Sequence, residues 1–215
     1  RAESGGGRQN EATTTNSSSP HIAGNFILSP HPLSDSQIQH FSGRVQAAAS
    51  GEVTSYPTDA WHACGAFSSR WQQVADFGSG VKLLCGPNGT INGHAYPWGY
   101  WHIKYRHMDE MQTMMYATNN TWTDLLYWAQ YYAVKSPEAR ASNNNTHKAC
   151  RSHRMYLYNR VTHQMVSDRV FRVIYLFGQS GGPTVPNGTI LTTLPDRRGQ
   201  CDAASVASGG VDTEP

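Results

Sequence analysis

Two histidines lie close together in a short basic segment, His102-Ile-Lys104-Tyr-Arg106-His107. An imidazole has an ordinary pKa of about 6.5, so it can accept or donate a proton near neutral pH. A guanidinium can hold phosphate oxygens through paired hydrogen bonds. Cleavage of RNA by its own 2′-hydroxyl needs a base, an acid and cations that stabilise the charge on phosphorus. The segment supplies all three without a metal ion or other cofactor, although solvated surface residues would give the same pattern.

A second basic region follows, in which aromatic residues are interleaved with cations. Residues 94–176 carry 10 of the 17 Lys and Arg side chains but only 5 of the 15 Asp and Glu side chains. A strand over 154–162 would place four of its side chains on one face. They are Arg154, Tyr156, Tyr158 and Arg160. Such a face suits RNA, because tyrosine rings stack on bases and arginines bind phosphate. The alternative is a half-solvated strand whose arginines cover tyrosine rings.

Periodicity predicts the elements that position these groups. Apolar spacing predicts one helix over 34–49 and another that begins at Thr121 or Thr123 and ends at Pro137. Residues 101–115 fit both a strand and a helix, so we expect a helix from about Met108 and leave 101–107 open. Strands are predicted over 81–85, 154–162, 169–177 and 189–194, with a hairpin turn at Asn88-Gly89 or Asn92-Gly93. The expected fold is α+β, with N-terminal helices followed by a C-terminal antiparallel β-meander sheet.

The composition indicates one folded domain with a polar tail at each end. Residues 1–20 are mostly Gly, Ser, Thr and Asn, and residues 202–215 are similar, so both are expected to be disordered. Residues 21–201 are expected to form a single α+β domain, which we take to be monomeric. No apolar run approaches the roughly 20 residues that cross a bilayer, so we expect no membrane span.

The four cysteines predict two disulfides and an oxidising compartment. Of the three connectivities that four cysteines allow, sequence order favours Cys64–Cys85 and Cys150–Cys201. Five glycosylation sequons begin at Asn16, Asn88, Asn119, Asn144 and Asn187. Together the cysteines and sequons favour a secreted glycoprotein.

A zinc site competes for one cysteine. The spacing His147-x-x-Cys150-x-x-His153 is similar to that of zinc ligands. The segment lacks a fourth ligand nearby, and its lysine and arginine neighbours repel a cation. We therefore expect no bound metal.

The chain resembles nuclease toxins of the barnase–EndoU–colicin–RelE superfamily over about residues 98–196. The resemblance is carried by the pattern His-Ile-x-x-Arg-His, by the helices after it, and by the closing strand Gly188-Thr-Ile-Leu-Thr-Thr-Leu-Pro195. It implies His102 or His107 as the general base or acid. It implies Lys104, Arg106 and Arg154 as phosphate ligands, and Thr192 or Thr193 as a hydrogen-bond donor to a phosphate oxygen. The His–Gly–His–Lys pattern of EndoU nucleases is not cleanly present, and residues 21–93 have no counterpart in a minimal toxin domain.

The sequence thus favours a secreted, cytotoxic endoribonuclease that needs no metal. Its catalytic residues are expected among His102, His107 and His153, with His163 as a further source of the second imidazole. RNA is the expected substrate, and an inhibitor or immunity protein is a candidate partner. The alternative is a secreted effector that binds carbohydrate or a polyanion without catalysis, which 6 Trp and 11 Tyr would suit. A glycan-active hydrolase is a third hypothesis.

Overall fold

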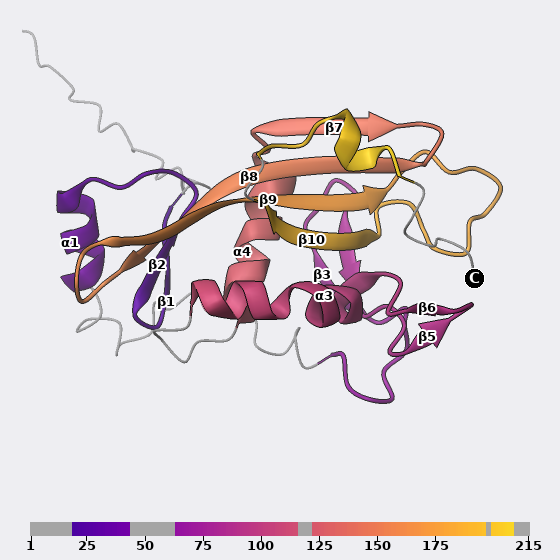
Figure 1. Ribbon diagram of the computed structural model, residues 1–215, viewed down its shortest axis with the longest axis horizontal. Helices are drawn as coiled ribbons and strands as arrows, with labels where there is room; N and C mark the ends of the chain where they lie inside the picture. Colours follow the sequence, from indigo (N-terminus) through magenta and orange to yellow (C-terminus); the bar gives the residue numbers. More distant parts are fainter. Residues whose placement is uncertain (1–18, 44–62, 116–121, 197–198, 209–215) are drawn as a thin grey trace, which may run out of the picture.

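A six-stranded antiparallel sheet forms the centre of the protein (Figure 1). The computed structural model describes residues 19–43, 63–115, 122–196 and 199–208. The sheet has the order β1-β2-β8-β9-β10, and β7 pairs with the other end of β8. Its strands are β1 (His21–Ala23), β2 (Phe26–Ser29), β7 (Ala139–Asn143), β8 (Lys148–Asn159), β9 (Met165–Leu176) and β10 (Ile190–Asp196).

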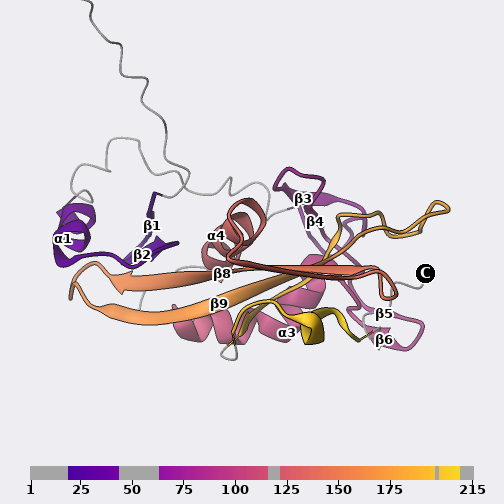
Figure 2. The ribbon, with the colours of Figure 1, turned by 90° about the horizontal axis from the view of Figure 1, so that it is seen from above.

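Two helices cover one face of this sheet (Figures 1 and 2). Helix α3 (Gly99–Met114) packs along β10, and α4 (Trp122–Lys135) packs across β8 and β9. Alternate strand residues such as Met155, Phe171 and Val173 are fully buried beneath them. The main apolar core therefore lies between the helices and the sheet.

Smaller elements surround the sheet. They are α1 (Asp35–Gly43), β3 (Gln73–Asp76), β4 (Lys82–Leu84), β5 (Thr90–Ile91), β6 (His94–Ala95) and the short helix η3 (Ala203–Val206). The turn between β5 and β6 is Asn92-Gly93, and both residues have positive φ, 49° and 82°. That conformation matches the twist of a two-residue hairpin and is one of the two predicted turns.

The mixed α+β class is confirmed, but the expected order of helices first and strands afterwards is not. The hairpin β1–β2 precedes α1, and β2 pairs with the end of β8 from Ser29↔Tyr156 to Phe26↔Asn159. The sheet is thus completed by strands from both ends of the chain. Residues 101–107 belong to α3, because Ile103 continues the apolar side of that helix. The part of the first predicted helix over 44–49 lies outside the described residues.

Both cysteine pairs predicted from sequence order are disulfide-bonded, Cys64–Cys85 and Cys150–Cys201. The sulfur of Cys150 is therefore not a thiolate that could bind zinc. The second bridge ties the C-terminal segment to β8, and Val206 of η3 is buried beside it. Order thus extends beyond Cys201 into the predicted tail of 202–215, whereas residues 1–18 lie outside the described part of the chain. None of the described helices has the length and apolar character to cross a membrane.

The N-terminal hairpin is anchored to α4 by His21. Its ring stacks on Trp128 with centroids 3.3 Å apart, and its Nε2 lies 2.6 Å from the hydroxyl oxygen of Tyr132. The Tyr132 hydroxyl donates its own proton to the Ser19 carbonyl, so Nε2 of His21 is the donor. Burial lowers the pKa of His21 to about 4, which keeps the stacked ring neutral at neutral pH.

Two adjacent threonines on β10 provide a test of this packing. Thr193 accepts a buried hydrogen bond from Nε2 of Gln130 on α4 at 2.9 Å, whereas the buried hydroxyl of Thr192 has no hydrogen-bond partner among the described residues. Thr193→Val should lower the free energy of unfolding by about 1–3 kcal/mol, because it leaves the buried amide N–H of Gln130 without a hydrogen-bond acceptor. Thr192→Val should be neutral or stabilising, because it replaces an unpaired hydroxyl with a methyl group. Urea denaturation measures both, and equal destabilisation by the two variants would contradict this assignment.

Candidate functional site

One side of α3 carries the polar residues of the site. Side chains three and four residues apart are neighbours on a helix, and His102, Arg106, Glu110 and Thr113 follow this spacing. The opposite side of the helix buries Met111 in the core. Because the apolar side is fixed against the sheet, the polar side must face outward.

The two histidines of the basic segment meet on this helix. Their ring centroids are 5.9 Å apart. Nδ1 of His102 lies 2.8 Å from the carbonyl oxygen of Tyr96, and Nδ1 of His107 lies 4.0 Å from Oε2 of Glu110. The hydrogen bond to the Tyr96 carbonyl favours the proton on Nδ1 of His102 and a lone pair on its Nε2, whereas Glu110 is near His107 without a hydrogen bond to it.

Burial and neighbouring charge favour the neutral form of both rings. Burial lowers the pKa of His107 to about 4, with smaller contributions from the charges of His102 and Arg106. Burial also lowers the pKa of His102, and the charge of Arg106 lowers it further. The hydrogen bond to the Tyr96 carbonyl opposes that shift for His102 only. His102 is thus the ring better suited to carry a proton, and His107 the ring better suited to accept one.

A groove of about 380 Å³ runs beside the C-terminal half of α3. Its lining residues come from α3, β10 and the start of β9, and they are Asp109, Glu110, Thr113, Met114, Val166, Ser167, Arg169 and Pro195. Glu110 joins the groove to the histidine pair through its contact with His107. Arg169 of β9 lines the same groove, and its guanidinium donates to the Asp168 carbonyl at 2.7 Å. The groove therefore lies next to the histidine pair, on the far side of Glu110, and contains a cation that can bind an anion.

The lysine and the arginine of the basic segment 102–107 both contact aromatic rings. Arg106 lies over the ring of Tyr105 at 5.3 Å, and Lys104 lies over the ring of Trp101 at 5.0 Å. Lys104 is two positions after His102, which places the two side chains roughly 200° apart around the helix. The helix thus brings Arg106, but not Lys104, to the side that carries His102.

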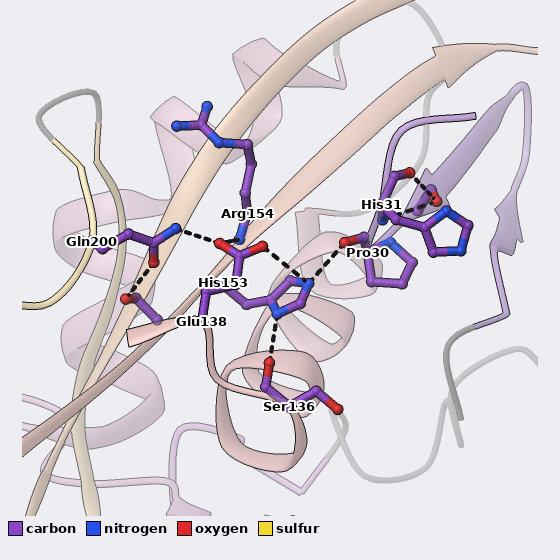
Figure 3. Close-up of polar contacts among 9 residues, drawn as sticks. Pro30, His31, Ser136, Glu138, His153, Arg154 and Gln200 are labelled. Carbon is purple, nitrogen blue, oxygen red and sulfur yellow. Dashed lines mark hydrogen bonds and ion pairs between the residues drawn. The ribbon is translucent and has the colours of Figure 1, made fainter. Parts of the chain in front are cut away.

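The third candidate histidine, His153, lies in a different polar cluster at the end of α4 (Figure 3). It is only 7% exposed, and its two ring nitrogens lie 2.7 Å from the carbonyl oxygen of Ser136 and 2.8 Å from that of Pro30. Glu138 is 3.7 Å away and also accepts from the backbone N–H of Arg154 and from Gln200. These contacts join β2, α4, β7 and β8, so the observed role of His153 is to hold these segments together.

The predicted basic and aromatic face of β8 is largely occupied by contacts within the protein. Arg154 forms an ion pair with Asp168 at 2.5 Å. The Tyr158 hydroxyl accepts from the backbone N–H of Leu33, and buried Arg160 donates to the Gly24 carbonyl. Tyr156 packs in the small apolar cluster around Ile27, Ile38 and Tyr158. At this end of the sheet β2 pairs with β8, and α1 packs on the face that carries the tyrosines. The sequence predicted neither contact.

The two threonines of the closing strand are both buried. Thr193 faces α4, where it accepts a hydrogen bond from Gln130, and Thr192 is 6% exposed. Neither threonine lines the groove beside α3.

Three residues of the site were not among the residues predicted from the sequence. Glu110 lies one turn after His107, so an i,i+3 search on the helix could have found it. Tyr96 and Arg169 reach the site through a loop and a distant strand, and no local spacing signals either. Among the described residues, no group of three or more His, Cys, Asp and Glu side chains could hold a metal ion.

Comparison with protein-family models, with curated proteins and with solved structures found no match for this chain. The chemistry of the site is therefore argued from its own geometry.

The electrostatic coupling on α3 can be measured by NMR titration of the histidine rings. His107 should titrate near pH 4. In Arg106→Gln its pKa should rise, because one of the charges that disfavour the imidazolium is removed. Arg140→Gln, on exposed β7, is the matched control and should leave His107 unchanged. An unchanged pKa in Arg106→Gln would show that the charge of Arg106 does not contribute to the low pKa of His107.

Proposed function

We propose that this protein is a metal-independent ribonuclease that cleaves RNA through its 2′-hydroxyl. The observation that carries the proposal is the pair of imidazoles with centroids 5.9 Å apart, in contact through His107 with Glu110, which lines the same groove as Arg169. Two imidazoles at this separation can reach the attacking oxygen and the leaving oxygen of one phosphodiester. One takes a proton from the attacking oxygen while the other gives a proton to the leaving oxygen.

His107 acts as the base in this mechanism. It is neutral at the pH where RNA is stable, because its pKa is lowered to about 4. The lone pair on its neutral ring removes the proton of the 2′-hydroxyl, and the Glu110 carboxylate 4.0 Å from Nδ1 stabilises the imidazolium that forms. The 2′-oxygen then bonds to phosphorus, and the bond from phosphorus to the 5′-oxygen breaks.

His102 acts as the acid. Its Nδ1–H donates to the Tyr96 carbonyl, so the protonated ring presents Nε2–H to the leaving 5′-oxygen. The products are a 2′,3′-cyclic phosphate and a free 5′-hydroxyl. The proton gained by His107 and the proton lost by His102 balance in each cycle, and exchange with water restores both rings.

Arg106 and Arg169 supply the positive charge that the phosphate needs. Arg106 is one turn from His102 on the exposed side of α3, and Arg169 lines the groove. A cation next to a phosphorane is most effective where burial excludes water from the site. The phosphate would also raise the pKa of a neighbouring histidine, because its negative charge favours the imidazolium.

This mechanism places the chemistry on α3 and in the groove. His153, Arg154, Tyr158, Arg160 and the two threonines of β10 have structural contacts and take no part in it. Lys104 lies toward the far side of the helix and would act only through its general positive charge.

The disulfides indicate an extracellular or oxidising compartment. Secretion, cytotoxicity and an inhibitory partner are part of our proposal, since an RNA-cleaving enzyme is harmful to the cell that makes it. Three sequon asparagines, Asn88, Asn144 and Asn187, lie at exposed positions, as a secreted glycoprotein requires.

The proposal is tested with the double variant His102→Asn/His107→Asn on total RNA in EDTA. Wild type should cleave and leave 2′,3′-cyclic phosphate ends. The variant should lose at least about 10³-fold in kcat, because asparagine keeps an N–H near the position of Nδ1 but cannot transfer the proton. His40→Ala, at an exposed position on α1, is the control and should cleave like wild type.

Circular dichroism should show that the double variant is folded. Cleavage retained by a folded double variant would refute the assignment of these histidines. Wild-type protein that binds RNA without cleaving it would instead support the alternative of a binding effector.

The pH dependence of kcat/KM gives an independent test. The base must be neutral, so activity should rise through about pH 4, where His107 loses its proton. The acid must be protonated, so activity should fall as pH passes the pKa of His102, which lies below the ordinary 6.5. We expect a bell-shaped profile with its maximum between about pH 4 and 6.5. A maximum at pH 8 would contradict these protonation states.

A further inference from the structure

We infer that Tyr105, supported by Tyr96, stacks a nucleobase next to the phosphate that is cleaved, which makes single-stranded RNA the substrate. This inference rests on the proposed function and extends it to a second part of the substrate. It concerns the N-terminal half of α3, the helix that follows the β5–β6 hairpin and packs along β10 (Figure 1).

Tyr105 presents an aromatic ring to solvent beside the acid–base pair. Its exposure is 58%, in a helix whose other apolar side chains are mostly buried. Tyr105 lies three residues after His102, so the two side chains are neighbours on the helix. An exposed ring in this position can offer its face to a base without blocking the groove.

Tyr96 fixes the orientation of that ring. The two rings have centroids 4.5 Å apart and are tilted by 33°. Tyr96 is in turn held at both backbone ends, since its N–H donates to the Gly89 carbonyl at 2.8 Å and its carbonyl accepts from His102 at 2.8 Å. One residue therefore positions both the stacking surface and the proton donor.

The backbone of Tyr96 is strained, which argues that its position matters. Its φ is 50°, in the left-handed region that residues with a Cβ rarely adopt. It also precedes Pro97, and a residue before proline is normally extended. Strained residues persist where surrounding contacts impose them, often at functional sites. Here those contacts are the ones to Gly89, His102 and Tyr105.

The charge beside the ring favours a nucleotide over a neutral ligand. The Arg106 guanidinium lies over Tyr105 at 5.3 Å and is also one turn from His102. A phosphate held by Arg106 would have its attached nucleoside close to the ring of Tyr105. A base paired within a duplex is already stacked on its neighbours, so only an unpaired base can occupy this surface.

The experiment measures binding and cleavage separately. Binding is measured by fluorescence anisotropy with a 2′-O-methyl RNA oligonucleotide, which has no 2′-hydroxyl to react. Cleavage kinetics use the same sequence as unmodified RNA, both single-stranded and annealed to its complement. The variants are Tyr105→Leu, which removes the ring, Tyr105→Phe, which keeps it, and Tyr131→Phe on α4 as the matched control.

We expect Tyr105→Leu to weaken binding of the single strand and to raise KM by about tenfold, in the range of one lost stacking contact. Tyr105→Phe and Tyr131→Phe should stay within twofold of wild type, and wild type should prefer the single strand to the duplex. Circular dichroism should show that all variants are folded.

Equal binding by wild type and Tyr105→Leu, or equal cleavage of single strand and duplex, would overturn the inference while leaving the proposed cleavage intact. Binding of a neutral chitin oligosaccharide that depends on Tyr105 would overturn it in favour of a sugar ligand. Absence of cleavage by wild type, with Tyr105-dependent binding of the oligonucleotide, would refute the proposed function and support the stacking surface.

Discussion

The burial of one side of α3 against the sheet is the contact on which the candidate site depends. Ile103 and Met111 are fully buried, and Met114 and Met115 continue the same apolar side. Leaving four such side chains exposed would be unfavourable by several kcal/mol in total. The helix therefore cannot rotate about its axis, and the polar residues on its other side are held in one orientation. Without this packing, a basic segment of the same composition would be an ordinary solvated surface.

The same packing sets the protonation of the site. His102 and His107 lie at the boundary between the buried and exposed sides of α3, where desolvation disfavours the imidazolium. The Tyr96 carbonyl then distinguishes one ring from the other by a single hydrogen bond. A difference in proton affinity between the two histidines thus follows from their burial and from one backbone oxygen. It is the kind of difference that acid–base catalysis requires.

On the opposite face of the sheet, contacts set by the topology engage the side chains of β8 that the sequence suggested would bind RNA. The arginines and tyrosines of β8 have the alternation expected of a nucleic-acid surface, but Tyr158 and Arg160 bond to the N-terminal hairpin and the segment after it. Arg154 is neutralised by Asp168. His153 occupies the helix side of the strand and spans three segments through two carbonyls and a carboxylate. Charge and spacing along a strand therefore do not reveal which of its groups are free to bind a ligand.

The sequence by itself determined the local elements and the covalent framework. The spacing of apolar residues predicted α4 and the three long C-terminal strands, Asn92-Gly93 predicted a hairpin, and cysteine order predicted both disulfides. It also placed His102, Arg106 and His107 within six residues of each other, so they stay close whichever local conformation the segment adopts. Only the tertiary structure decided that β2 pairs with the end of β8, that Arg169 lines the groove beside α3, and that the Tyr96 carbonyl contacts His102. These contacts join residues whose separation along the chain carries no periodic signal, so they are specified by the burial of the whole core and not by any local pattern.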